Sequence, residues 1–354
     1  MNRIATMAIA ATAVAGIAGG TFAATTGAGD AGGPAGDASA TTGGTRTPDG
    51  PVAAFYLDGR TIVDGDRKVP VAGLTIDNVR SLERVSGGWF VVTATSPQEP
   101  AFRGTYVAAD GTTTDIGDFF GLWDVDDQGD RVVARFDDTY QVRDVTTGEV
   151  TEEVTVGADV APSGSAAFAG ADVVSAWIEE GKHPRTRLFR TDLGTGTEHE
   201  VTQDLFSSTV SPDGRWLLGE RYRIQETSGE LCLGGGPVDD FAEQGWGTCD
   251  WRTNGLKPQF SPDGTRLLVV PYETEGFGPT QYGVLDSTNG RVTQEIDLPE
   301  WASDAAWGDD ETVFLHGYPD ADLTGGVVYR CTLDGDCRRE VTSTRPIVLG
   351  TQAG

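Results

Sequence analysis

Short apolar runs alternate with tight-turn residues throughout the chain beyond residue 50. The phrase Ser-Pro-Asp-Gly occurs at 211–214 and 261–264, each time after an apolar residue and before a strand-like run such as 265–270. These four residues in this order favour a type I turn, because proline sets φ at the first central position. Since β-forming residues flank both turns, each phrase predicts a hairpin. No stretch beyond residue 50 has helical periodicity, so the pattern predicts an all-β fold.

The hairpin signal recurs at a regular interval. Gly214 and Gly264 lie 50 positions apart, and a degenerate copy of the turn lies at 125–133. Weaker copies near 82–92, 161–177 and 306–315 give six repeats with a period of roughly 40–50 residues, the range of propeller blades. Three repeats contain a second turn, in which an apolar residue, an aspartate and a glycine are spaced four apart: Tyr140, Asp144, Gly148; Leu188, Asp192, Gly196; Tyr282, Asp286, Gly290. Each repeat therefore predicts four short antiparallel strands, or one blade.

The Ser-Pro-Asp-Gly phrase after an apolar strand residue resembles the WD40-like repeat of TolB-type β-propellers, which are exported bacterial proteins. The match is sharpest at 210–218 and 260–270 and extends as architecture over 52–346. The resemblance implies a ring of blades around a central channel, most often a platform for binding or assembly. Some propellers carry enzymes, and some gate serine peptidases.

The two ends of the predicted propeller suggest how it closes. Residues 52–71 predict three short strands before the first full repeat, and 346–349 form an apolar run after the sixth. Joining both ends in one composite blade would give seven blades and remove open sheet edges. Six blades, with an N-terminal strand added to the last one, is the alternative. In either case 51–354 is expected to be a single domain.

The N-terminal segment predicts export. A basic start at 1–3 precedes an Ala-rich apolar run at 4–18, and Thr21-Phe22-Ala23 offers small residues for cleavage. We expect a signal peptide at 1–23, with an uncleaved membrane anchor as the alternative, and no membrane span after processing. Residues 24–50 are rich in Gly, Ala and Thr and predict a flexible linker. A secreted or envelope-associated protein follows.

The four cysteines fit an oxidising compartment. Proximity in the sequence favours the pairs Cys232–Cys249 and Cys331–Cys337 among the three possible pairings. A three-residue loop would place the second pair directly opposite each other in a hairpin, within disulfide reach. A metal site is the alternative, but His316 is the one further candidate ligand and it is distant in sequence.

The net charge of −28 argues against nucleic acid and anionic membranes as partners. Residues 124–129 resemble the start of a calcium loop, but the twelfth position is Arg135 in place of the required glutamate. The same residues explain a blade turn. We therefore expect no metal site and no cofactor.

Catalytic motifs are lacking. The three histidines are His183, His199 and His316, and no G-x-S-x-G, H-E-x-x-H or P-loop motif occurs. We expect no catalytic residues, and a non-enzymatic binding or scaffold propeller. The alternative is a propeller enzyme, a glycan lyase or hydrolase acting from the central face.

One segment, 223–258, departs from the repeat and predicts a long loop stapled by Cys232–Cys249. Loops on rigid scaffolds often carry function. Asp239, Asp240, Trp246 and Trp251 are the candidate binding residues, and the tryptophans could instead fill a small core of the loop itself. We expect a monomer whose partner is a protein, a peptide or an envelope polysaccharide.

Overall fold

The computed structural model describes residues 53–352 except 75, 96–100, 158–159, 180–184, 204, 206, 226–227, 255–256, 258, 275–277, 299–300 and 319–324, and only the backbone of 207, 222–225 and 228–231. The predicted signal peptide at 1–23, the predicted linker at 24–50 and His183 lie outside the described residues. The chain divides into two compact units, Met1–Thr47 and Pro48–Gly354, and only the second contains described residues. No helix within the described ranges is long and apolar enough to cross a membrane.

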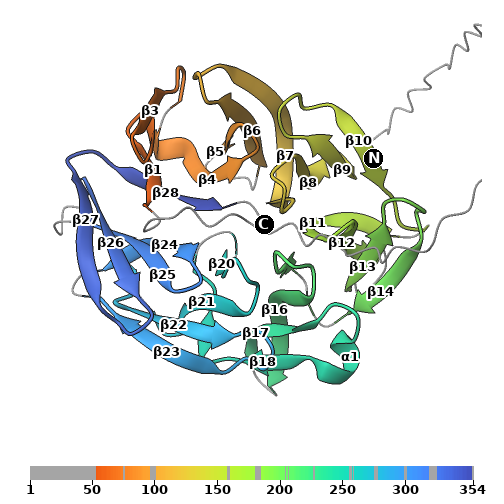
Figure 1. Cartoon of the computed structure of the whole chain (residues 1–354). Helices are drawn as coiled ribbons and strands as arrows, with labels where there is room; N and C mark the ends of the chain where they lie inside the picture. The colour runs from red at the N-terminus through yellow and green to blue at the C-terminus, as the bar shows by residue number, and fades with distance from the viewer. Residues whose placement is uncertain are drawn as a thin grey trace, which may run out of the picture. The chain divides into compact units, whose positions relative to one another are not determined.

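Strands make up most of the described residues, and most of them pair antiparallel with their neighbours in sequence (Figure 1). The first strand group joins both ends of the chain's second unit: β28 (Ile347–Gln352), β1 (Phe55–Asp58), β2 (Thr61–Asp64) and β3 (Arg67–Pro70). A 3-10 helix, η1 (Ile76–Asn78), precedes the next group. That group contains β4 (Val79–Val85), β5 (Gly88–Ala94), β6 (Ala101–Ala108) and the first part of β7 (Thr113–Val125).

The later groups repeat the same meander (Figure 1). The end of β7 continues into β8 (Arg131–Phe136), β9 (Thr139–Asp144) and β10 (Val150–Val154). The next groups are β11 (Val160–Ala169), β12 (Asp172–Glu179), β13 (Thr186–Asp192), β14 (Glu198–Thr202), and then β15 (Ser207–Val210), β16 (Trp216–Gln225), β17 (Ser228–Pro237), β18 (Trp246–Thr248). The last groups are β20 (Gln259–Phe260), β21 (Arg266–Pro271), β22 (Gln281–Asp286), β23 (Val292–Asp297), and then β24 (Ala302–Asp309), β25 (Thr312–Gly317), β26 (Gly326–Thr332), β27 (Cys337–Ser343).

The Ser-Pro-Asp-Gly turns join the first strand of a group to the second, as the sequence predicts. The Gly264 amide donates to the Ser261 carbonyl at 2.8 Å, and the buried Ser261 hydroxyl accepts from the Arg266 amide at 3.0 Å. Gly264 has a φ of +71°, and a Cβ there would lie 3.1 Å from the Ser211 side chain. Each turn thus requires glycine because it is left-handed and packs on the turn of the preceding group.

The hydrophobic cores lie between successive strand groups. Leu218 of β16 and Leu233 of β17 pack with Leu267 of β21 and Leu285 of β22, and each is at most 2% exposed. Fully burying such a side chain contributes roughly 1.5–3 kcal/mol. Similar clusters join the other neighbouring groups in the part of the chain that the structure describes. Packing between sheets therefore holds the repeats together.

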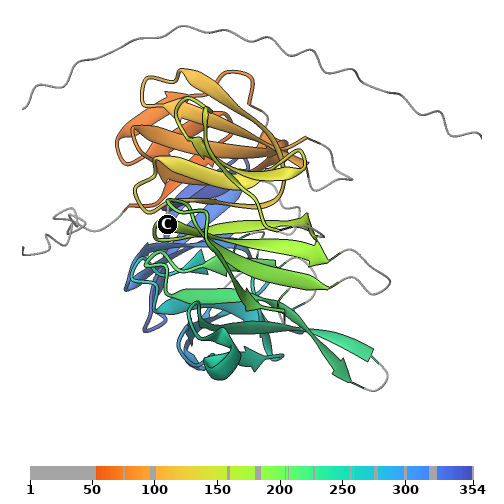
Figure 2. The same cartoon turned by 90° about the vertical axis from the view of Figure 1, so that its right-hand side faces the viewer.

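The segment 223–258 differs from the predicted loop. Most of it lies in regular strands, because β16 and β17 pair along ten residues each and extend beyond the neighbouring strands (Figure 2). The glycines at 234–236 lie within β17, and a Cβ on Gly235 would lie 2.3 Å from the Trp246 ring. The glycine run therefore makes room for a tryptophan packed on the sheet. A short helix, α1 (Phe241–Gln244), connects β17 to β18, and β19 (Trp251–Arg252) pairs with β21.

Candidate functional site

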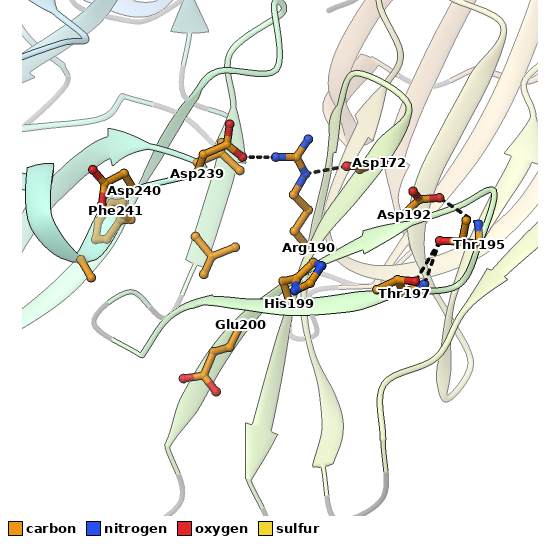
Figure 3. A pocket seen from close by; sticks show the side chains of 13 residues that line it. Asp172, Arg190, Asp192, Thr195, Thr197, His199, Glu200, Asp239, Asp240 and Phe241 are labelled. Atoms are coloured by element: carbon orange, nitrogen blue, oxygen red, sulfur yellow. Dashed lines mark hydrogen bonds and ion pairs between the residues drawn. The ribbon is translucent and has the colours of Figure 1, made fainter.

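A pocket of about 620 Å³ lies between β13, β14 and the segment that leads into α1 (Figure 3). Its walls come from two successive strand groups, so residues about 50 positions apart in sequence face each other. The lining residues are Asp172, Arg190, Asp192, Thr195, Thr197, His199, Glu200, Val201, Val238, Asp239, Asp240, Phe241 and Ala242. Carboxylates are the most frequent charged groups in this lining.

Arg190 links the two walls of the pocket. Its Nε lies 2.5 Å from Asp172 Oδ2 on the neighbouring strand, and its Nη1 donates to Asp239 of the opposite wall (Figure 3). The Asp239 side chain is 85% exposed, whereas that of Asp172 is 19% exposed. The Asp172 contact is therefore the more protected half of this bridge, and solvent reaches the Asp239 half.

The other carboxylates of the pocket have separate environments. The Thr195 amide donates to Asp192 Oδ1 at 2.8 Å, and this hydrogen bond lowers the pKa of Asp192. Burial opposes ionisation of Glu200, but hydrogen bonds from Arg187 and Gln203 lower its pKa. Both groups therefore carry a negative charge at neutral pH.

The pocket also has an apolar part. Phe241 of α1 is 5% exposed and Val238 is 4% exposed, and both pack in the core shared with β13 and β16. Val201 packs against the same cluster. Carboxylates thus stand beside an apolar floor, an arrangement that can hold an amphipathic cation.

Two of the four predicted binding residues, Asp239 and Asp240, lie in this pocket. Asp240 accepts a hydrogen bond from Gln244 Nε2 at 2.7 Å and remains exposed. The tryptophans lie elsewhere. Trp246 donates its Nε1 proton to the Ser287 carbonyl at 2.8 Å, and its ring packs over Gly235.

Trp251 packs similarly on the following strand group. A Cβ on Gly283 of β22 would lie 2.7 Å from the Trp251 ring, and both tryptophans join the core between β17 and β21. This is the alternative in which the rings fill a core. Ligand contact through Trp246 or Trp251 stays a prediction.

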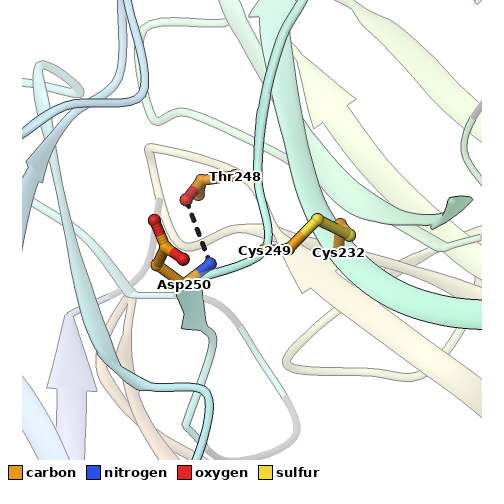
Figure 4. Close-up of a disulfide and its surroundings, with 4 residues drawn as sticks. All are labelled: Cys232, Thr248, Cys249 and Asp250. Carbon is orange, nitrogen blue, oxygen red and sulfur yellow. Dashed lines mark hydrogen bonds between the residues drawn. A yellow bond between two sulfur atoms is a disulfide. The ribbon is translucent and has the colours of Figure 1, made fainter.

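Both predicted disulfides are present. Cys232 of β17 pairs with Cys249, which follows β18, at a Cα–Cα distance of 4.4 Å (Figure 4). The Asp250 amide beside it donates to Thr248 Oγ1 at 3.3 Å. Cys331 and Cys337 lie directly opposite each other in β26 and β27. The first bridge holds the end of the segment that carries α1 against β17.

Sequence reasoning did not identify Arg190, Asp172 or Phe241 as part of the site. Arg190 lies between Phe189 and Thr191 in β13, with nothing in the local sequence to distinguish it from an ordinary solvated strand residue, and its partner Asp239 is 49 positions away. Its role depends on two strand groups meeting. The nearest signal in the sequence was the departure from the repeat at 223–258, which located one wall.

A second polar cluster is buried where distant strand groups approach one another. Lys257, which precedes β20, places Nζ 3.1 Å from Glu83 Oε2 and 3.3 Å from Asp124 Oδ1. Trp123 donates to Glu83 Oε1 at 2.7 Å, and the Phe168 amide donates to Asp124 Oδ2 at 3.0 Å. The Glu83 side chain is 1% exposed and that of Asp124 is 9% exposed. Both carboxylates are thus held by several donors.

Burial is the dominant influence on this central cluster. It raises the pKa of Asp124 to about 6, against the effect of the adjacent Lys257 ammonium. Burial alone would lower the pKa of Lys257, but Glu83 and Asp124 together raise it above its ordinary value. The lysine therefore stays protonated between the two side chains.

A third group, on β24 and β25, contains the half-buried Asp304 and the buried His316. Asp304 accepts a hydrogen bond from the Ala305 amide at 2.9 Å, and burial raises its pKa to about 6. His316 lies opposite Asp304, with Nδ1 2.8 Å from Ser303 Oγ and no partner for Nε2 among the described residues. Burial lowers the pKa of His316 to about 4, so its ring is neutral at physiological pH.

No protein-family model and no curated protein matches the chain. Among solved structures, TolB from Acinetobacter baumannii is 14% identical, with 75% of this chain and 67% of that chain covered and a TM-score of 0.43. The β-propeller domain of the Trilobed protease from Pyrococcus furiosus is 12% identical, with 51% and 57% covered and a TM-score of 0.40. Kuenenia stuttgartiensis hydrazine synthase is 11% identical, with 86% and 99% covered and a TM-score of 0.49. The likeness is one of fold, to the kind of protein that the Ser-Pro-Asp-Gly repeats resemble.

Proposed function

We propose that the chain forms a closed propeller of seven blades, in which β28 and β1–β3 make the closing blade. The antiparallel pairing of β28 with β1 supports this, since it joins the two ends in one sheet. A cluster of Ala54, Ile347 and Leu349 with Phe314 and Val328 supports it further, because it packs this sheet on β25 and β26. A six-bladed ring would leave β2 and β3 without a place in a blade.

We propose that this propeller is an exported, non-enzymatic module that binds a protein or peptide partner. The observation that carries the proposal is the pocket beside the stapled segment, whose carboxylates Asp239 and Asp240 are exposed. A rigid array of sheets with an accessible polar pocket on connecting segments is suited to recognition. The two disulfides support export, since such bonds persist in oxidising compartments. The envelope polysaccharide remains the other ligand class.

The test compares two variants that change the charge equally. Asp239→Asn/Asp240→Asn alters the pocket, and Asp334→Asn/Asp336→Asn alters exposed positions in the β26–β27 turn. Wild type and both variants are immobilised and exposed to envelope and culture-supernatant fractions, and captured proteins and glycans are identified and their affinities measured with purified material. We expect a partner that the wild type and the turn variant capture and the pocket variant captures several-fold less. Equal capture by all three would contradict the pocket as the binding site.

A propeller enzyme is the second candidate function, and Asp304 is the observation that favours it. Its side chain keeps some solvent access, and its pKa of about 6 suits a group that exchanges protons near neutral pH. Purified protein is assayed on cell-wall and polysaccharide substrates together with Asp304→Asn. Turnover by the wild type that the variant lacks would favour this candidate over the binding module.

A further inference from the structure

The pocket already holds one guanidinium. Arg190 reaches across it from β13 and contacts Asp172 on its own side and Asp239 on the other (Figure 3). The structure therefore already shows a cationic side chain bound between the two walls of the pocket. Its partner Asp239 is 85% exposed, so this half of the bridge is open to competition from solvent.

The charge of the pocket exceeds what Arg190 can neutralise. Among the lining residues Arg190 is the permanent cation, whereas five carboxylates line the same space. Arg187 outside the lining pairs with Glu200. Asp192 and Asp240 accept hydrogen bonds from Thr195 and Gln244, which are uncharged donors. Arg190 also attracts Asp192 electrostatically, so an incoming cation finds its least compensated carboxylate at the exposed Asp240.

The floor of the pocket suits the stem of a long side chain. Val201 lines the pocket as a half-buried side chain, and the edges of the buried Phe241 and Val238 lie next to the carboxylates. Lysine and arginine combine an aliphatic stem with a cationic head, and each gains from apolar contact along the stem while the head stays solvated. A metal ion would gain nothing from this floor, and no metal-holding cluster of side chains occurs in the described ranges.

We propose that the pocket is a subsite for a lysine or arginine side chain of the partner protein. This rests on the proposed function, since it names the group that the binding module recognises. The stem lies along Val201 and the edges of Phe241 and Val238, and the head contacts Asp239 and Asp240. Arg190 acts as an internal competitor, because the incoming cation takes over the Asp239 carboxylate while Arg190 keeps its contact with Asp172. Neutral and anionic glycans have no cation that could replace Arg190 at Asp239.

Short peptides of defined sequence test the proposal without a known partner. The probes are acetylated, amidated Gly-Ser-Lys-Ser-Gly, its arginine counterpart, and a norleucine counterpart that keeps the stem and lacks the ammonium. Binding to the full chain is measured by calorimetry at low ionic strength, where surface charges are screened least. We expect the lysine and arginine peptides to bind and the norleucine peptide to bind about three- to fivefold more weakly, since it lacks the ammonium that pairs with the exposed carboxylates.

Two variants should change this affinity in opposite directions. Asp239→Asn/Asp240→Asn should weaken lysine-peptide binding about three- to tenfold, and Arg190→Gln should strengthen it about two- to fivefold by freeing Asp239, as exposed ion pairs of this strength imply. The turn variant Asp334→Asn/Asp336→Asn is the control and should bind as the wild type does. Thermal unfolding of each variant checks that it is folded. If Arg190→Gln does not fold, Asp240→Asn alone is used as the second variant.

The outcomes separate this inference from the function on which it rests. Equal affinity for the lysine and norleucine peptides, or weaker binding after Arg190→Gln, would overturn the cationic subsite. If a captured partner still depended on Asp239 and Asp240 in the pull-down, the binding module would stand with a different ligand group. If no partner depended on them while the peptides behaved as expected, the subsite would stand and the proposed macromolecular partner would fall.

Discussion

Replacing Lys257 with methionine should strongly destabilise the fold. The change keeps the apolar stem and removes the ammonium that lies 3.1 Å from Glu83 and 3.3 Å from Asp124. Removing one partner from a buried ion pair costs about 3–5 kcal/mol, because a charge stays buried without compensation. The lysine side chain is 17% exposed, so some water reaches the site and we expect a loss of about 3 kcal/mol, the lower end of that range.

Urea denaturation followed by far-ultraviolet circular dichroism measures this loss under non-reducing conditions. With a slope of about 3 kcal/mol per molar, a loss of this size lowers the midpoint by about 1 M urea. The exposed Lys68→Met is the matched control, and it should change stability by less than about 0.5 kcal/mol. A midpoint for Lys257→Met that equals that of the wild type at pH 8 would refute the reasoning.

The pH dependence gives a second check on the same variant. The folded-state pKa of Asp124, about 6, lies above its ordinary value of 3.8, so the folded protein binds this proton more tightly than the unfolded chain. Stability from this group is therefore gained as pH falls through 6. Without Lys257 the charged form of Asp124 is still less favourable, so the deficit of Lys257→Met should be smaller at pH 5 than at pH 8.

A triple variant separates the charge from the packing. Lys257→Met/Glu83→Gln/Asp124→Asn removes every charge of the cluster, while the new amide oxygens can still accept hydrogen bonds from Trp123 and the Phe168 amide. We expect the triple variant to recover most of the stability that Lys257→Met loses, since neutral replacements of a buried ion pair are often tolerated. No recovery would mean that the lost energy came from packing.

Three further changes test other parts of the structure. As pH falls from 7.5 to 5, the free energy of unfolding of His316→Gln should rise by about 2 kcal/mol relative to that of the wild type. The reason is that the unfolded wild-type chain binds a proton on His316 in this range, whereas the folded ring, with a pKa of about 4, does not. Urea midpoints at both pH values measure the difference. Gly264→Ala should lower the free energy of unfolding by about 1–3 kcal/mol, since the alanine would adopt a φ of +71° with its Cβ against the Ser211 side chain. Thermal unfolding of Gly335→Ala is the control, because that residue also has a positive φ but open space around it, so the difference between the two variants reports the contact with Ser211. Cys232→Ser/Cys249→Ser should lower the free energy of unfolding by about 3 kcal/mol, because the unfolded chain is no longer cross-linked and gains conformational entropy. This change in stability alone would not explain a loss of peptide binding by the folded variant.

The repeated turns could be predicted because their chemistry is local. The glycines at 214 and 264 sit three residues after the serine whose carbonyl each amide contacts, and the whole turn is contained in one phrase. The second turns follow the same rule, since the Gly290 amide reaches the Asp286 carbonyl within one loop. The pairing of Cys331 with Cys337 also needed only a hairpin register. Structural features whose contacts all lie within a few residues of each other can thus be predicted from the sequence.

The segment 223–258 shows where local reasoning fails. A run of three glycines predicts a loop, yet in β17 the small residues admit the Trp246 ring and the Gly245 backbone. This packing depends on where α1 returns the chain. The central cluster is harder still, because Lys257 is 174 positions from Glu83 and 133 from Asp124. In so acidic a chain no local pattern distinguishes these two carboxylates from the others.

The same comparison explains why the central cluster and the pocket differ in what they can bind. In the central cluster the internal cation Lys257 is 17% exposed, and both of its carboxylates are more deeply buried and also accept hydrogen bonds from a neighbouring amide or indole. An incoming cation would have to displace Lys257 from a site with little water, and salt should change its pairing little. In the pocket, Arg190 pairs with Asp239, whose side chain is 85% exposed. Replacing Arg190 there by an incoming cation therefore costs little free energy, and the binding of that cation weakens with added salt. A salt titration of lysine-peptide affinity should therefore be steep, while the stability difference between the wild type and Lys257→Met should be nearly flat over the same range.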